Sequence, residues 1–251
     1  MEYPVFINLL LFGESFFRLD FGHICASGRV LAAVHRFAMS VRRLVCVEGN
    51  IASGKSSLVE RLLSISGKVN LIPEPLDSWQ NYGGVNPLEL MYADPKSWSF
   101  WFQSKVQIDM VLKHCQLKDC LNIMERSIFS ARYCFVENLK KQELLSIGEY
   151  NALDANFSCF VGKHSIRPDM FVYLRTSPEI CKERLVARNR KEEKSVSLEY
   201  LKSLHDLHEK WLLKNCEYPV QIVDASLGLD SVVESVSRRL SDDGLEKHKR
   251  I

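Results

Sequence analysis

The segment from Gly49 to Ser56 reads GNIASGKS and fits the phosphate-binding pattern G-x-x-x-x-G-K-[ST]. The apolar run 43–48 predicts a short buried strand before it, and the amphipathic run 56–63 predicts a helix after it. This order places backbone N–H groups and the positive end of a helix around a phosphate. The segment therefore predicts a nucleoside-triphosphate site, in which Lys55 contacts the β- and γ-phosphates and Ser56 binds Mg²⁺. The residues expected around the phosphates are Gly49, Asn50, Ile51, Ala52, Ser53, Gly54, Lys55, Ser56 and Ser57.

After the loop, apolar runs typical of strands alternate with segments typical of helices. Strands are expected at 69–73, 121–124, 169–174 and 220–223. Helices are expected at 87–95 (short, with a turn), 96–118, 128–142, 149–163, 197–214 and 230–240, with another beginning at Pro178 behind the N-cap Ser177. Repeated strand–helix units predict an α/β fold in which helices cover both faces of a parallel sheet.

Composition indicates an intracellular globular protein. The 251 residues are 46% apolar and 25% charged, and a net charge of +2 argues against a partner such as nucleic acid or an anionic membrane. The eight cysteines are scattered without a C-x-x-C pair, which indicates reduced thiols in the cytoplasm or a mitochondrial matrix. The apolar run 5–12 is shorter than the roughly 20 residues that a membrane-spanning helix needs.

Residues 1–42 differ from the rest of the chain. Between Phe21 and Val47 there is no acidic residue while arginine recurs, which is typical of an amphipathic mitochondrial transit peptide. Acidic residues nearer the start are unusual for such a peptide, so a non-catalytic extension is an equal alternative. We expect one folded domain at 43–240, followed by a polar tail at 241–251.

Charged residues follow two of the predicted strands. Glu74 comes directly after the strand 69–73, and Glu125 and Arg126 come after the strand 121–124. Because ligands of parallel α/β sheets bind outside the carboxyl ends of the strands, these side chains are expected to meet beside the phosphate loop.

Several segments between Val45 and Asp224 resemble, in the same order, motifs of the animal deoxyribonucleoside kinases. They are EP at 74–75 with Trp79, NPL at 86–88 with LMY at 90–92, FQS at 102–104, MERSIFSARYCFVEN at 124–138 and YLRTSPE at 173–179. The likeness is strongest to the mitochondrial thymidine kinases and the broad-specificity deoxynucleoside kinases. It implies a P-loop kinase fold with a five-stranded parallel sheet, a homodimer, and transfer of the γ-phosphoryl group of ATP to the 5′-hydroxyl of a deoxynucleoside.

The resemblance also implies roles for the residues at the strand ends. Glu74 matches the carboxylate that accepts the proton of the 5′-hydroxyl, and Arg126 matches the arginine that meets developing charge on the transferred group. Glu125 matches the acid that holds Mg²⁺ together with Ser56. Lys55 completes the expected catalytic set.

The nucleoside pocket is implied in the same way. Gln103 matches the glutamine that pairs with the base edge, Phe135 the ring that stacks on the base, and Tyr92 with Glu193 the pair that binds the sugar 3′-hydroxyl. Other residues expected to line this pocket are Trp79, Met91, Phe102, Val106, Met110 and Ala131. Deoxycytidine kinases carry arginine and aspartate where this chain has Met110 and Ala131, so the resemblance implies a pyrimidine preference, with thymidine and deoxycytidine first.

The basic run 184–194 matches the lid that closes over the ATP phosphates, and Arg188 and Arg190 are the expected phosphate contacts. Three residues depart from the family pattern. Val186 replaces one lid arginine of the broad-specificity relatives, Lys105 stands where relatives usually have tyrosine, and Trp101 replaces a smaller side chain.

Two other classes of protein fit parts of this pattern. A catalytically silent nucleotide-binding subunit could keep the fold, but it would be free to lose some of the catalytic set. A kinase of nucleoside monophosphates would need extra basic residues near Tyr92 and Gln103 to hold a second phosphate, and the apolar character there favours an uncharged acceptor.

Overall fold

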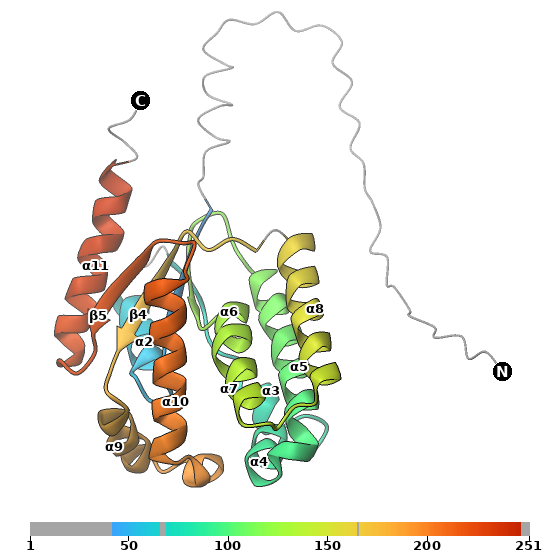
Figure 1. Cartoon of the computed structure of the whole chain (residues 1–251). Coiled ribbons are helices and arrows are strands. Elements are labelled where there is room, and N and C mark those ends of the chain that lie inside the picture. Colours follow the sequence, from blue (N-terminus) through green and yellow to red (C-terminus); the bar gives the residue numbers. More distant parts are fainter. Residues whose placement is uncertain (1–41, 66–68, 165, 247–251) are drawn as a thin grey trace, which may run out of the picture. The chain divides into compact units, whose positions relative to one another are not determined.

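A central strand, β1 (Arg43–Gly49), is paired on both sides and carries the phosphate loop at its carboxyl end. The computed structural model describes residues 42–65, 69–164 and 166–246. Within them, a five-stranded sheet has the order β2-β3-β1-β4-β5 and every pair is parallel (Figure 1). The other strands are β2 (Val69–Ile72), β3 (Leu121–Glu125), β4 (Met170–Arg175) and β5 (Val220–Asp224). The predicted parallel α/β fold is therefore confirmed.

Alternate residues of β1 face opposite layers, because successive side chains of a strand point to opposite faces. Val45 and Val47 pack with α2 (Lys55–Ile65) and α11 (Leu229–Glu246) in one core cluster, while Leu44 joins the larger cluster on the other face. The remaining helical elements are α3 (Leu76–Gln80), α4 (Pro87–Ala93), α5 (Pro95–His114), α6 (Ile128–Ser130), η1 (Ala131–Val136), α7 (Glu137–Lys141), α8 (Ile147–Lys163), α9 (Pro178–Arg188), η2 (Lys191–Ser195), α10 (Leu198–His208) and η3 (Glu209–Lys214). Both faces of the sheet are thus covered (Figure 1).

The helix ends show why several elements begin where they do. Ser177 caps α9, since its hydroxyl accepts a hydrogen bond from Ile180 N at 3.3 Å and Pro178 occupies the first helical position, as predicted. Ser146 and Glu149 form a reciprocal capping box at the start of α8. Asn86 and Asp94 cap α4 and α5, since each side chain accepts a hydrogen bond from the backbone N–H three residues later.

Four predicted helices differ from those observed. The segment 128–142 is interrupted by η1, a π-helical stretch, and 197–214 ends in the π-helical η3. Helix α5 ends at His114, short of the predicted 118, and the final helix continues to Glu246, into the segment predicted as a polar tail. The short helix α3 was not predicted at all.

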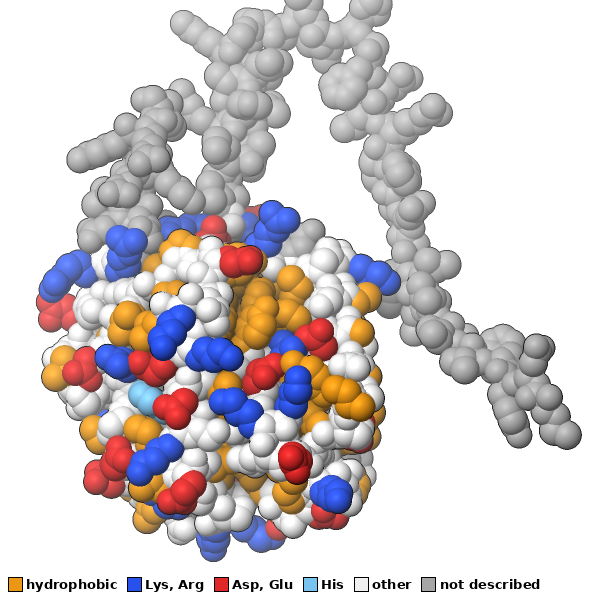
Figure 2. Space-filling view, viewed as in Figure 1, with side chains coloured by type: hydrophobic (Ala, Val, Ile, Leu, Met, Phe, Trp, Pro, Cys, Tyr) orange, Lys and Arg blue, Asp and Glu red, His pale blue; other side chains and the backbone are white. Residues whose placement is uncertain are grey.

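The structure describes only a small part of the predicted N-terminal extension and C-terminal tail. Residues 1–41 and 247–251 lie outside the described part of the chain, so the transit-peptide and tail predictions stay predictions. Among the described helices, none has both the length and the apolar character that crossing a membrane requires. On the face shown in Figure 2, acidic and basic side chains are interspersed over the surface.

The candidate active site

The phosphate loop depends on a glycine at position 49. Gly49 has φ +146°, and a Cβ placed there would lie 2.7 Å from Leu174 O and 2.8 Å from Ser53 Oγ. Those distances are closer than any side chain can approach, so the turn from β1 into the loop requires glycine. Gly54, with φ +102°, then leads into α2, whose N-terminus faces the cavity.

Lys55 is buried beneath this loop. Its ammonium group donates hydrogen bonds to Gly49 O at 3.2 Å and to Asn50 O at 2.7 Å. Burial, and to a smaller extent the positive charge of Arg126, lowers the pKa of Lys55 to about 8. The loop therefore presents a concentrated positive charge where a phosphate can bind.

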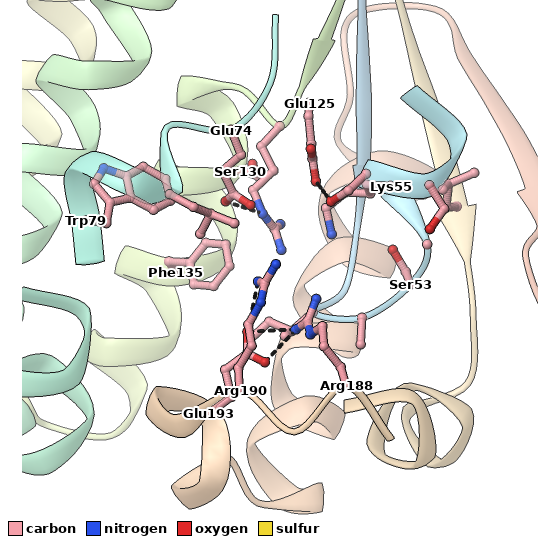
Figure 3. Close-up of a pocket in the computed structure, with 18 of the residues that line it drawn as sticks. Ser53, Lys55, Glu74, Trp79, Glu125, Ser130, Phe135, Arg188, Arg190 and Glu193 are labelled. Carbon is pink, nitrogen blue, oxygen red and sulfur yellow. Dashed lines mark hydrogen bonds and ion pairs between the residues drawn. The ribbon is translucent and has the colours of Figure 1, made fainter. Parts of the chain in front are cut away.

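Glu74 and Arg126 meet at the ends of β2 and β3, as expected from the strand order. Arg126 Nε lies 2.9 Å from Glu74 Oε1, an ion pair marked by a dashed line at Glu74 in Figure 3. Arg126 Nη1 donates to Gly49 O at 3.0 Å. The Arg126 guanidinium also lies over the ring of Phe135, 5.0 Å from its centroid. Burial raises the pKa of Glu74, whereas the charge of Arg126 opposes that rise. The pair joins the phosphate loop to the acceptor half of the cavity.

Arg126 has a left-handed backbone conformation with φ +60°, which is unusual for a side chain of this kind. Its N–H donates to Val47 O at 2.9 Å, and the next residue, Ser127, caps α6. The Ser127 hydroxyl also donates to Glu48 Oε1 at 2.5 Å. Glu48 is buried, and its desolvation raises its pKa to about 7. These contacts fix the sharp turn that aims Arg126 into the cavity.

Ser56 and Glu125 form a pair of oxygen ligands beside Lys55. The Ser56 hydroxyl donates to Glu125 Oε1 at 2.7 Å (Figure 3). Hydroxyl and carboxylate oxygens are the ligands that Mg²⁺ prefers, and protein Mg²⁺ sites usually take the remaining ligands from water and phosphate. The donor set therefore fits Mg²⁺ bound together with a nucleotide.

The acceptor half of the cavity is mostly apolar and aromatic. Trp79 and Phe102 stand edge to face, with ring centroids 5.9 Å apart. Gln103 is buried, and its Oε1 has no hydrogen-bond partner among the described residues. Met110 and Ala131 are both buried in the wall. A planar heterocycle packed against these aromatic side chains could pair with the Gln103 amide.

The lid contributes Glu193, which lies on η2 beside two arginines. Arg188 Nη2 lies 2.7 and 2.6 Å from the two carboxylate oxygens, and Arg190 Nη1 lies 3.6 Å from Oε1 (Figure 3). Tyr92 lines the same part of the cavity, and burial raises its pKa well above the usual range, so its hydroxyl stays protonated.

One cavity of about 510 Å³ gathers nearly the whole predicted set. Gly49 and Asn50 are the exceptions, since neither lines it. The Asn50 amide donates to Leu201 O at 2.8 Å and its oxygen accepts from Ile51 N at 2.9 Å, so this side chain ties the loop to α10. The predicted residues that do line the cavity are Ile51, Ala52, Ser53, Gly54, Lys55, Ser56, Ser57, Glu74, Trp79, Met91, Tyr92, Phe102, Gln103, Val106, Met110, Glu125, Arg126, Ala131, Phe135, Arg188, Arg190 and Glu193.

Other cavity residues were not among the predicted site residues. Arg184 donates to Ser53 O at 3.3 Å and to Ala225 O at 2.8 Å, bridging the phosphate loop and the segment after β5. Leu227 and Leu229 are exposed apolar side chains of the same wall. Arg184 belongs to the basic run noted in the sequence, but nothing in the sequence indicates that the distant 225–229 segment faces the loop.

Comparison with known proteins agrees with this geometry. A sequence model described as deoxynucleoside kinase matches residues 45–242. Mitochondrial thymidine kinase 2 of Macaca fascicularis is 43% identical over 180 residues, covering 71% of this chain and 68% of the relative. The human protein of the same name is 40% identical over 198 residues, covering 77% and 74%. Mitochondrial deoxyguanosine kinase of Xenopus laevis is 38% identical over 202 residues, covering 70% and 75%.

The fold and the cavity define a P-loop phosphotransferase with an acceptor pocket built for an uncharged, ring-containing molecule. The chain belongs to the deoxynucleoside kinase family. It is accordingly an ATP-dependent deoxynucleoside kinase.

Proposed function

We propose that this kinase acts on pyrimidine deoxynucleosides, with thymidine and deoxycytidine as its first substrates, and that it transfers the γ-phosphoryl group of ATP to their 5′-hydroxyl. The observation that carries the proposed phosphoryl transfer is the ion pair between Glu74 and Arg126. It lies in one cavity between the phosphate loop and the aromatic acceptor pocket. A hydroxyl placed there has the Glu74 carboxylate, which can accept its proton, on one side and the bound phosphates on the other.

In the proposed reaction, Glu74 accepts the proton of the 5′-hydroxyl while that oxygen bonds to the γ-phosphorus and the bond to the β-phosphate oxygen breaks. Arg126 and Lys55 meet the negative charge on the transferred and leaving groups. Ser56 and Glu125 would hold Mg²⁺, which supplies further charge neutralisation at the phosphates when bound. The low dielectric around these buried groups strengthens each interaction.

The pyrimidine preference is supported by the small apolar side chains in the acceptor wall. Met110 and Ala131 place no charge opposite the base, and Val106 lies one helical turn before Met110 on α5. An apolar wall accommodates the 5-methyl group of thymine. The Gln103 amide, with a donor and an acceptor side by side, can pair with either thymine or cytosine.

The proposed sites for the sugar and for ATP combine Tyr92 of α4 with side chains of the lid. Tyr92 and Glu193 are assigned to the 3′-hydroxyl of the sugar, and Arg188 and Arg190 to the ATP phosphates. We add the exposed apolar side chain of Leu227, beside the phosphate loop, as a surface for the purine of ATP.

We also propose a homodimer and a mitochondrial location. Ile108 and Leu112, one turn apart on α5, are 48% and 57% exposed, which is the kind of apolar stripe that an interface between subunits covers. The mitochondrial location rests on the names of two relatives, thymidine kinase 2 and deoxyguanosine kinase, and on the arginine-rich composition of residues 1–42.

The test is ATP- and Mg²⁺-dependent phosphorylation of thymidine, deoxycytidine, deoxyadenosine and deoxyguanosine, with thymidine monophosphate as a fifth acceptor. Rapid turnover of both pyrimidines and slow turnover of both purines is the expected result. Equal rates on purines would overturn the base preference alone. Turnover of the monophosphate alone would show that the acceptor pocket holds a second phosphate, and ATP binding without turnover would indicate a silent subunit.

A further inference from the structure

Helix α5 carries two neighbouring rows of side chains with different surroundings. One row lines the cavity and consists of Phe102, Val106 and Met110. The other row, one residue earlier in each turn, consists of Trp101, Lys105 and Asp109, and none of its members lines the cavity. Two of these three, Trp101 and Lys105, are among the three residues noted in the sequence as departures from the family pattern.

Asp109 is the centre of the second row. Its Oδ2 accepts hydrogen bonds from Trp79 Nε1 at 2.9 Å and from Ser78 Oγ at 3.1 Å, both on α3. The Ser78 hydroxyl also lies 2.8 Å from Pro75 O, next to Glu74. One carboxylate of α5 therefore holds the helix that follows the proposed catalytic base.

Lys105 makes the burial of that carboxylate possible. Its ammonium group lies 2.6 Å from Oδ1 and 2.5 Å from Oδ2 of Asp109, and both side chains are largely buried. A buried carboxylate without a cation would be strongly disfavoured. The same ammonium group lies 4.9 Å from the ring centroid of Tyr82, which also meets Trp101 edge to face at 5.9 Å. The second row thus supports the whole segment from α3 to the turn at Tyr82.

We propose that Asp109 is a positioning residue for base selection: through the indole N–H of Trp79 it fixes the wall of the base pocket, and the ion pair with Lys105 holds its carboxylate in place. The inference rests on the proposed deoxynucleoside pocket. Trp79 is only 5% exposed and stands against Phe102, so its position sets the space for a base. In Figure 3 its indole nitrogen points away from Phe135, which leaves the ring rather than the N–H for the substrate.

The direction of the effect follows from this arrangement. Asp109 lines no part of the cavity, and its hydrogen-bond donors are Ser78, Trp79 and Lys105. Because it contacts neither Glu74 nor Arg126, we expect its loss to spare that pair and the phosphate loop. A Trp79 side chain freed from Asp109 can leave its rotamer, which loosens the fit to a pyrimidine and admits a larger base. The Michaelis constant for thymidine therefore rises while kcat stays nearly constant, and discrimination against purines falls.

The test combines Asp109→Ala, Trp79→Phe and the double variant, in the full chain. Trp79→Phe removes the N–H donor and keeps an aromatic side chain. We expect each single variant to weaken thymidine binding about tenfold, the scale of one charge-assisted hydrogen bond. The double variant should be no weaker than Trp79→Phe alone. Thymidine dissociation constants from calorimetry are compared with KM, kcat and the ratio of kcat/KM for thymidine to that for deoxyguanosine.

Two further variants separate positioning from simple destabilisation. Asp109→Asn keeps an acceptor for the indole and should recover most of the thymidine preference that Asp109→Ala loses. Glu209→Gln removes a more exposed ion pair, with Arg175, and neither residue lines the cavity, so this variant should leave the preference unchanged. Losses in the two single variants that multiply in the double variant, or a lower Tm for Asp109→Ala with unchanged thymidine binding, would overturn the proposal. Thymidine binding without turnover in the unmodified chain would sink the proposed reaction only, since the binding comparison still decides the role of Asp109.

Discussion

Arg188 and Glu193 join the two ends of the proposed substrate site: Nη2 of the arginine lies 2.7 and 2.6 Å from the two oxygens of the carboxylate. The arginine is assigned to the phosphates of ATP and the glutamate to the sugar of the acceptor. Because one contact contains a group from each half, binding of either substrate is coupled to the other, and such coupling is reciprocal.

Glu193→Gln is expected to raise the Michaelis constant for thymidine by about 10- to 100-fold, because hydrogen bonds to charged groups contribute about 1.5–3 kcal/mol. The same variant frees Arg188 from its ion pair, so ATP binding in the absence of thymidine should become tighter. Calorimetric titration of ATP, with and without thymidine, measures both effects. Arg238→Gln, which removes an exposed ion pair with Glu234 on α11, is the control. Weaker ATP binding in Glu193→Gln would contradict the coupling.

Variants of the two proposed catalytic residues, Glu74 and Arg126, should lower kcat by different factors. Glu74→Gln removes the base and is expected to lower kcat by about 10²–10⁴-fold. Arg126→Met should be at least as damaging, about 10³–10⁵-fold, because it removes a cation beside the transferred group and also leaves Glu74 buried without its partner. Single-turnover rates measure the chemical step directly. An Arg126 variant that is faster than Glu74→Gln would refute the assignment of Arg126 to the transferred charge.

His208 should make the protein less stable as the pH is lowered, which opposes the effect of Glu48, whose pKa burial raises to about 7. Nδ1 of His208 lies 2.7 Å from Leu204 O, and its Nε2 is buried with no partner among the described residues, so a second proton has nowhere favourable to go. Burial lowers its pKa to about 3 from a usual value of 6.5. Between those pH values the unfolded chain binds one more proton than the folded chain, so unfolding becomes easier as pH falls below about 6.5.

Urea unfolding at pH 7 and pH 5 measures this dependence. His208→Phe keeps a ring stacked on Tyr173 and removes the titrating group, so its free energy of unfolding should change less between the two pH values. The difference from the unmodified chain approaches about 1.4 kcal/mol per pH unit for one proton. Identical pH dependence in His208→Phe would rule out His208 as the source.

The proposed dimer interface on α5 can be tested by introducing charged side chains into it. Ile108→Glu combined with Leu112→Glu places two acids on an exposed apolar stripe without touching the cavity. We expect the unmodified chain to sediment as a dimer and the double variant as a monomer in analytical ultracentrifugation. Ile147→Glu, on α8, tests whether that exposed residue belongs to the same interface. A dimer that persists in the α5 variant would move the interface elsewhere.

The meeting of Glu74 and Arg126 was predictable, because the carboxyl ends of parallel strands lie at the same edge of a sheet. Glu74 and Arg126 needed only that rule, and their contact is observed. The contact between Asp109 and Trp79 was not predictable, because it depends on how a short unpredicted helix packs on α5. Asp109 and Lys105 stand four residues apart, which the sequence shows, but helix spacing alone cannot say that their pair is buried.

The π-helical stretch η1 escaped prediction for a different reason. A period of 3.6 residues describes the apolar pattern of 128–142 well, and one extra residue in a turn hardly changes it. Yet η1 begins at Ala131 and contains Phe135, both of which line the acceptor pocket. The contact between Glu48 and Ser127 also escaped prediction. Glu48 was expected only as part of a buried strand, and its hydrogen-bond partner Ser127 follows a different strand.

Base selection offers the sharpest test of the acceptor pocket. Met110→Arg with Ala131→Asp introduces the pair that deoxycytidine kinases carry, at two positions buried in the pocket wall. The new charges can hydrogen-bond the polar edge of cytosine but leave less room for the 5-methyl group of thymine. We expect kcat/KM for thymidine to fall by about 100-fold or more and that for deoxycytidine to change by less than about tenfold.

Each single variant is the natural control for this pair. Met110→Arg alone buries an unpaired cation and Ala131→Asp alone an unpaired acid, so each should reduce turnover of both pyrimidines and lower Tm. Recovery of deoxycytidine turnover in the double variant, without recovery for thymidine, would show that the two side chains act together on the base. Equal losses for both pyrimidines in all three variants would mean that positions 110 and 131 support the pocket without selecting its occupant.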